Sequence, residues 1–143
     1  MKISKYNIHL HSIFVHFTNG LYPVAVLFLI LFKIFQHESF RSTYFYLLLL
    51  ASISVPISFL TGIIEWKQKY KGAQVRIFTR KYTYGIVLMG VGSFCTVWSC
   101  ISPEIIRGSG ILNFVFILLN FAILPLVAYL GYLGGKLVFG GAH

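Results

Sequence analysis

Four apolar stretches, each long enough to cross a lipid bilayer as a helix, constrain this chain more than any other feature of its sequence. They cover about residues 12–34, 43–64, 82–101 and 111–133. About 20 residues of α-helix span the roughly 30 Å of hydrocarbon in a membrane. Charged residues make up only 10% of the chain, whereas an average soluble domain carries about 25%. The sequence therefore predicts an all-α, polytopic membrane protein. Residues 1–143 are expected to form one domain, an up-down bundle of four transmembrane helices.

The distribution of basic residues predicts the orientation of the bundle. Nine of the twelve lysines and arginines lie in the N-terminal segment, the loop between the second and third spans, and the C-terminal tail. The other three are Lys33, Arg41 and Arg107. Because short cytoplasmic loops are enriched in bases, we expect both termini to be cytoplasmic. This topology explains the net charge of +9 by the basic residues on the cytoplasmic side. We therefore expect the lipid bilayer as a partner and no nucleic acid.

The basic N-terminus is not expected to be a cleaved signal peptide. The apolar run that follows it, from Ile13 to Phe35, is too long for the hydrophobic region of such a peptide, and no small-residue cleavage site follows. We expect a retained first helix.

Small and polar residues at helical spacing predict which helix faces meet. Two sets recur every four positions: Ser54, Ser58 and Gly62 in the second span, and Gly92, Thr96 and Cys100 in the third. Small residues let membrane helices approach closely, so both sets are expected to face the bundle interior. Asn113 and Asn120 lie seven residues apart in the fourth span and are expected to hydrogen-bond between helices.

Two histidines and one acid form the candidate site. His11 and His16 lie at the start of the first span, and Glu65 directly follows the second. An up-down bundle places these helix ends beside each other, so we expect all three side chains to converge. Ionisable groups at such depth are costly and mark functional positions, and imidazole is a common metal ligand. The alternatives are interfacial histidines bonded to carbonyls or lipid headgroups, and a Glu65 salt bridge to Lys67 or Lys69.

Several enzyme classes are excluded by the motifs that the chain lacks. It contains no Walker loop, no GxSxG and no HExxH sequence. With three acidic residues in all, it also lacks paired carboxylates for acid–base catalysis. Cys95 and Cys100 are five residues apart, so they point to different faces of a helix and form no CxxC motif. We therefore do not expect an enzyme that acts by itself.

Three short segments follow one another in the order seen in a known family. They are HSIFVHFT (residues 11–18), TGIIEW (61–66) and LGGKLVF (133–139). They resemble the HP-x-x-VHFP, sG-x-x-DW and LGG-x-LVY segments of a bacterial family of small predicted membrane proteins, catalogued as a domain of unknown function. The resemblance spans nearly the whole chain. It implies four helices in a bacterial inner membrane. It also implies an association with electron transport, because relatives are joined to iron–sulfur or cytochrome-type domains.

The chain departs from that family at positions that matter for a cofactor. Two family prolines are replaced by Ser12 and Thr18. Relatives have a histidine at the opening of the third helix, where this chain has Arg80, Lys81 and Tyr82. A low-spin haem between helices takes one histidine from each of two helices, and the loss of the second puts that ligation in doubt.

The favoured hypothesis is a membrane subunit or anchor of an electron-transfer system, acting with a redox partner protein or a larger membrane complex. The expected cofactor is a b-type haem or a quinone near the cytoplasmic face. His16 or His11 is its expected ligand, with Tyr84 as another ligand option.

The bases that open the third helix complete this hypothesis. Arg80, with Arg76 and Lys81, is expected to pair with haem propionates or a quinone headgroup. Two alternatives remain open. One is a cofactor-free structural or regulatory membrane protein. The other is a small-molecule channel or transporter, favoured by Pro23, Pro56 and Pro125 inside the spans.

Overall fold

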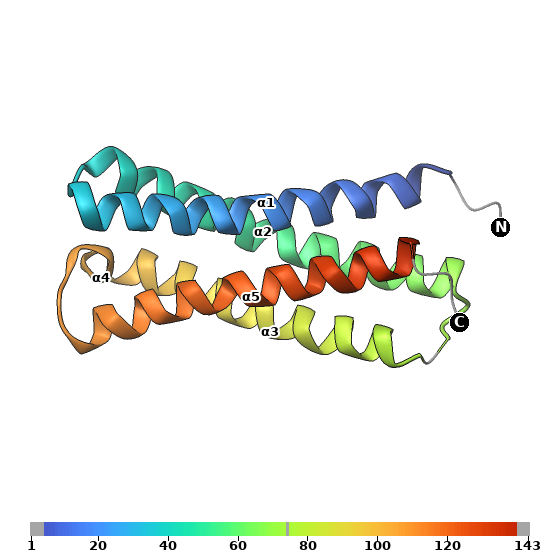
Figure 1. The fold of residues 1–143 in the computed structure, drawn as a ribbon. Coiled ribbons are helices and arrows are strands. Elements are labelled where there is room, and N and C mark those ends of the chain that lie inside the picture. Colours follow the sequence, from blue (N-terminus) through green and yellow to red (C-terminus); the bar gives the residue numbers. More distant parts are fainter. Residues whose placement is uncertain (1–4, 74, 140–143) are drawn as a thin grey trace.

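Four long helices packed side by side make up most of the molecule (Figure 1). The computed structural model describes residues 5–73 and 75–139, with side chains described for residues 11–73 and 75–137. The helices are α1 (Lys5–Phe35), α2 (Glu38–Lys69), α3 (Arg76–Ile101), the short α4 (Glu104–Arg107) and α5 (Ile111–Phe139). Within the described ranges, α1, α2, α3 and α5 are long and apolar enough to cross a membrane. The predicted fold class is confirmed.

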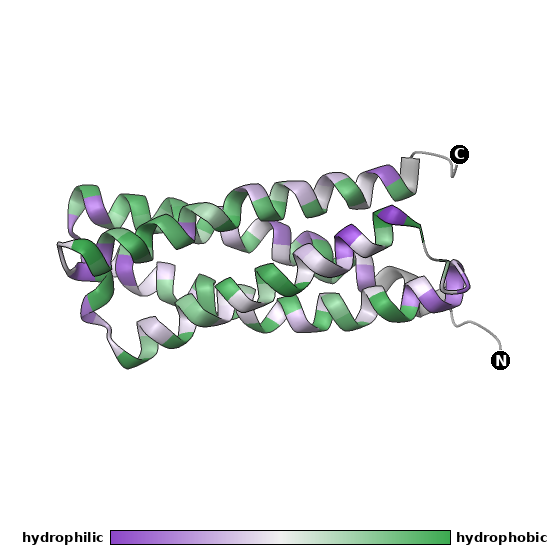
Figure 2. Ribbon diagram, turned by 90° about the horizontal axis from the view of Figure 1, so that it is seen from below, coloured by the Kyte–Doolittle hydropathy of each residue, from purple (hydrophilic) through white to green (hydrophobic). Residues whose placement is uncertain are grey.

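The two ends of the bundle differ in what they carry. The start of α1, the α2–α3 loop and the end of α5 lie together at one end (Figure 1). We call it the basic end, because Lys69, Lys71 and Arg76 lie in or beside that loop. The α1–α2 connection and α4 lie at the opposite end, the α4 end. Figure 2 shows that the most hydrophilic residues lie mainly towards the two ends.

Each predicted span lies inside a longer helix, because hydropathy marks the part of a helix that contacts lipid and not where the helix stops. The second predicted span ends at Ile64, whereas α2 continues to Lys69. The connection between the third and fourth predicted spans contains the one-turn helix α4. Pro103 precedes that turn, where its missing N–H costs nothing. The Gly108 N–H closes the turn on the Glu104 carbonyl at 2.7 Å.

Small residues on α2 face α1, as expected from their spacing. Ser54 is buried and hydrogen-bonds Thr18 of α1 at 2.8 Å, and Gly62 lies against the ring of His11. The set expected on α3 is only partly correct. Gly92 and Thr96 are buried, but Cys100 is exposed.

The inward face of α3 is set by the helical period. Eight residues separate Gly92 from Cys100, and at 100° per residue they turn the chain about 80° past two full turns. Ser99 lies nearer the centre of the inward face and is buried in place of Cys100.

Polar side chains in the interior bond across helices. Ser52 of α2 lies 2.7 Å from the Thr96 hydroxyl of α3, and Tyr44 of α2 donates to Asn120 of α5 at 2.7 Å. Asn113 of α5 donates to the Ile105 carbonyl of α4 and accepts from Lys33 of α1. The expectation that both asparagines bond between helices is therefore confirmed. Among the described residues, every buried side-chain nitrogen and oxygen has a hydrogen-bond partner.

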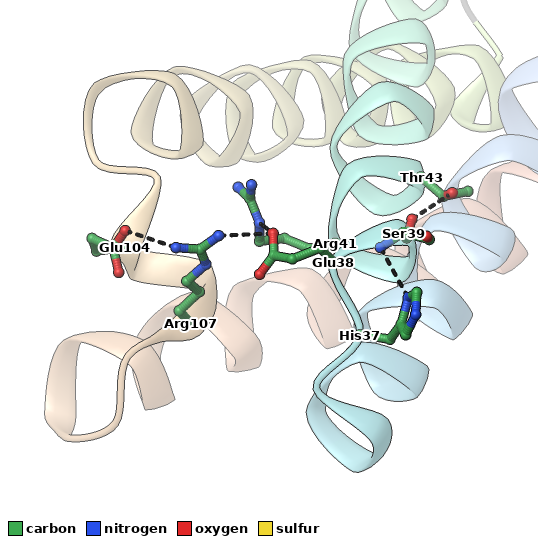
Figure 3. A network of polar contacts seen from close by, with 7 residues as sticks. All are labelled: His37, Glu38, Ser39, Arg41, Thr43, Glu104 and Arg107. Atoms are coloured by element: carbon green, nitrogen blue, oxygen red, sulfur yellow. Dashed lines mark hydrogen bonds and ion pairs between the residues drawn. The ribbon is translucent and has the colours of Figure 1, made fainter.

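Ion pairs hold α4 against the start of α2 (Figure 3). Glu38 accepts from Arg41 within α2 and from Arg107 of α4, both at 2.7 Å. Arg107 also lies 3.5 Å from Glu104. The Glu38 carboxylate raises the pKa of the Arg107 guanidinium above its ordinary value. These pairs attach the α3–α5 connection to α2 at the α4 end.

Candidate functional site

His11 of α1 meets two polar side chains of α2 at the basic end. Its Nδ1 lies 3.2 Å from the Thr61 hydroxyl, and its Nε2 lies 3.6 Å from a Glu65 carboxylate oxygen. Thr61 and Glu65 are four residues apart and so share one face of α2. Between them, Gly62 leaves room for the ring, because an added Cβ there would lie 2.9 Å from the His11 Cε1. The His11 and Glu65 side chains are only 12% and 18% exposed.

Two lysines surround this pair. Lys69 lies one turn beyond Glu65 on α2, with its Nζ 3.8 Å from the carboxylate. Lys81 of α3 interacts electrostatically with both Glu65 and His11. We call the set of His11, Thr61, Glu65 and Lys81 the His11 site. It joins three helices, and its single acid, Glu65, interacts with the His11 imidazole, with the Lys81 ammonium and with Lys69 outside the set.

His16 does not join this site, so that part of the prediction is wrong. It lies on the exposed surface of α1. Five residues separate it from His11, and at 100° per residue the two side chains point about 140° apart. Thr18, seven residues after His11, returns to the inward face and is buried. The outward position of His16 could have been predicted from the helical period. Two histidines lie on one face of a helix only if they are three, four or seven residues apart.

Arg80 and Tyr84 also lie elsewhere, between α3 and α5. The Arg80 guanidinium donates to the Tyr129 hydroxyl at 3.4 Å. The rings of Tyr84 and Tyr129 meet edge to face with their centroids 4.9 Å apart. Both Arg80 and Tyr84 are exposed. Both side chains therefore contact Tyr129 of α5.

Lys81 is the base that faces the site because it lies 100° from Arg80 around α3. Gly85, one turn further on, is buried against Phe59 of α2, which marks this face of α3 as the inward one. Sequence reasoning named Lys81 only beside its neighbours and missed Thr61. Thr61 could have been predicted, because it lies four residues before Glu65 and therefore on the same face of the helix.

The family of the chain follows from a comparison with family models. The model described as predicted membrane protein (DUF2231) matches residues 7–142. The chain belongs to the DUF2231 family. The match covers the His11 site, α2 to α5 in full and α1 from residue 7 onward. It confirms the resemblance to a family of small predicted membrane proteins. No curated protein and no solved structure matches the chain.

The His11 site of this DUF2231 chain does not fit a haem. Both ring nitrogens of His11 face partners on α2, Thr61 and Glu65. The ring itself lies against Gly62, so no flat space separates α1 from α2 there. In the part of the chain with described side chains, no group of three or more His, Cys, Asp and Glu residues is arranged to hold a metal ion.

The same donor set does fit a group with carbonyl oxygens. The Lys81 ammonium, the His11 ring and the Thr61 hydroxyl all carry hydrogens that they can donate. The Glu65 carboxylate can accept a hydrogen bond from a bound hydroxyl. A quinone headgroup has the carbonyl and hydroxyl chemistry that such residues recognise.

Proposed function

We propose that this DUF2231 chain is a membrane subunit or anchor of an electron-transfer system, and that the His11 site binds a quinone headgroup. One observation supports this most directly. A histidine and a carboxylate lie 3.6 Å apart, largely buried, at one end of a membrane bundle and beside a lysine from a third helix. Such groups are costly in a membrane protein and are usually kept for function.

Each residue of the site has a defined task in this proposal. Lys81 donates a hydrogen bond to a carbonyl oxygen of the headgroup, and the His11 Nε2 does the same by giving up its 3.6 Å contact with Glu65. Thr61 holds the His11 ring in place, and Lys69 holds the Glu65 carboxylate from the opposite direction, with its Nζ 3.8 Å away. A quinone supplies two-electron, two-proton chemistry, with the electrons coming from a redox partner protein. The His11 imidazole and the Glu65 carboxylate are the groups of the site that can take up and release protons.

The expected topology places this site on the cytoplasmic side of a bacterial inner membrane. The basic end carries the α2–α3 loop with its lysines and arginines, which the positive-inside rule assigns to the cytoplasm. A quinone would reach the site sideways from the lipid, and a redox partner would approach from the cytoplasm. Protons would come from the same side.

Tryptophan fluorescence tests this proposal. The chain has two tryptophans, and Trp66 directly follows Glu65, with its indole N–H on the Ala73 carbonyl at 2.9 Å. In a Trp98→Phe background, titration with a short-chain ubiquinone is expected to quench Trp66 in a saturable way. A hydrogen bond to a charged group contributes about 1.5–3 kcal/mol. Lys81→Met and His11→Ala are therefore each expected to weaken binding about tenfold or more.

His16→Ala is the matched control, because it removes an exposed histidine from the same helix. It should leave quinone binding unchanged. The proposal fails if the parent protein shows no saturable quenching. It also fails if Lys81→Met and His11→Ala both bind the quinone as tightly as the parent does.

A cofactor-free role in packing is the competing candidate, and one observation favours it. His11 already has partners within the chain, Thr61 and Glu65. In that case no quinone binds, and His11→Ala lowers the stability of the bundle without any change in ligand binding.

A further inference from the structure

We propose that the surface where α3 and α5 meet at the basic end binds the phosphate of an anionic phospholipid. We call this surface the α3–α5 face, and its residues are Arg76, Arg80, Tyr84, Tyr129, Tyr132 and Lys136. It is separate from the His11 site, because Arg80 and Lys81 point about 100° apart around α3. The proposal does not depend on a quinone.

Tyr129 of α5 is the centre of the contacts on this face. Its hydroxyl accepts a hydrogen bond from the Arg80 guanidinium at 3.4 Å. Its ring meets the ring of Tyr84 edge to face, and it stacks on the ring of Tyr132 with the centroids 6.4 Å apart. One tyrosine thus connects a base of α3 with aromatic rings of both helices. An arginine that is already positioned loses less conformational freedom when it binds a ligand.

Helical spacing adds two more bases to this face. Arg76 lies four residues before Arg80 and so shares its face of α3. Lys136 lies four residues after Tyr132 on α5. Because α3 begins and α5 ends at the basic end (Figure 1), both steps lead from the contact of Arg80 with Tyr129 towards that end. All three bases are exposed, so three positive charges belong to one part of the surface.

The acidic side chains of the chain do not neutralise these bases, because all three are engaged elsewhere. Glu65 pairs with His11 in the interior. Glu38 and Glu104 both pair with Arg107 at the α4 end. The bases of the α3–α5 face therefore attract a negative charge from outside these side chains.

The surface next to the bases is apolar on the side that faces the membrane. Arg80 lies just before the third predicted span. Val87 follows it by seven residues on the same face of α3, and Ala122 precedes Tyr129 by seven residues on α5. Both Val87 and Ala122 are exposed, and each lies about 10 Å deeper along its helix. The order of charge and hydrocarbon along this surface is that of a phospholipid, which favours a lipid over a soluble phosphate.

The polar groups of this face match a phosphate. A guanidinium has five N–H donors, and the contact with Tyr129 uses one of those of Arg80. Arginine binds two phosphate oxygens at once with its remaining donors. The Tyr129 hydroxyl, which accepts from Arg80, can donate its own hydrogen to the same phosphate. Basic surfaces between membrane helices on the cytoplasmic side bind anionic headgroups. A zwitterionic headgroup carries its own ammonium group, which the three bases repel.

Native mass spectrometry with added lipid tests the proposal. The full-length protein in a neutral detergent is titrated with phosphatidylglycerol, or with phosphatidylcholine that has the same acyl chains. We expect the first phosphatidylglycerol to bind at least tenfold more tightly than phosphatidylcholine. Arg80→Gln should weaken phosphatidylglycerol binding about fivefold or more. Lys67→Gln is the matched control, because it removes the same charge from an exposed position near the end of α2. It should bind the lipid within twofold of the wild type.

Three results would overturn the lipid site. The first is wild-type protein that binds both lipids equally. The second is a folded Arg80→Gln protein that binds phosphatidylglycerol as the wild type does. The third is an equal loss in Arg80→Gln and Lys67→Gln, which would indicate diffuse attraction to the whole basic end. If Arg80→Gln does not fold, Tyr129→Phe removes the hydroxyl but keeps the ring, and it is expected to weaken binding about threefold or more.

Inorganic phosphate separates a lipid site from a site for free phosphate. An excess of phosphate, added as its ammonium salt, should leave phosphatidylglycerol bound, because it lacks the acyl chains that lie on the apolar surface. Displacement of the lipid by phosphate alone would show that the site takes a free phosphate and would contradict the proposal. Since no quinone is present, a failure of quinone binding leaves these affinities unaffected.

Discussion

The contact between Gly92 of α3 and Tyr22 of α1 should make Gly92→Ala strongly destabilising. An added methyl group would overlap the Tyr22 hydroxyl oxygen and lie 3.1 Å from the ring carbon that bears it. Tyr22 is fully buried, so its ring cannot move away into solvent or lipid. Overpacking of this kind costs about 1–3 kcal/mol. Displacement of the hydroxyl from Ser52, which lies 3.5 Å from it, adds about 1 kcal/mol.

Gly90→Ala provides the matched control on the same helix. Nothing lies within 4 Å of a Cβ added at Gly90, so the substitution should be neutral or should stabilise the helix by up to about 1 kcal/mol. We therefore expect the two variants to differ by about 2–4 kcal/mol. The free energy of unfolding is measured in mixed detergent micelles by titration with sodium dodecyl sulfate, followed by circular dichroism. Equal stability of the two variants would refute the packing of Tyr22 against Gly92.

Two further predictions concern topology and cofactor. Reporter fusions in the connection at residues 36–42 should report a periplasmic position, and fusions in the α2–α3 loop should report a cytoplasmic one. The reason is that the basic residues concentrate at the basic end. The reverse result would contradict the orientation. Protein purified from haem-replete cells should show no Soret band, since both ring nitrogens of His11 face α2. A Soret band that is lost in His11→Ala would show that the ring turns towards a haem, against the geometry described above.

The helices could be predicted from the sequence because their apolar stretches are long. The family resemblance rested on three short segments at the ends of those stretches. Helix rotation was harder to predict. His16 was expected at the site on the strength of its depth, but its position on α1 turns it to the outside. The pairing of His11 with Glu65 followed from the up-down connection alone, which fixes the ends that meet. The membership of Thr61 and Lys81 in the site could not be predicted, because it depends on which faces of α2 and α3 point inward. Contacts such as that of Gly62 with His11 decide this.

The length of α2 sets how deep the His11 site lies in the membrane. Its 32 residues rise about 48 Å, roughly 18 Å more than the hydrocarbon core is thick. Charged residues occupy both ends of α2, so this excess extends into the headgroup layers. Glu65 then lies at the boundary between acyl chains and headgroups, and Lys69 lies beyond it. At that level the proposed quinone would enter from the side through the lipid, and the proposed redox partner would contact the last turn of the same helix from the water.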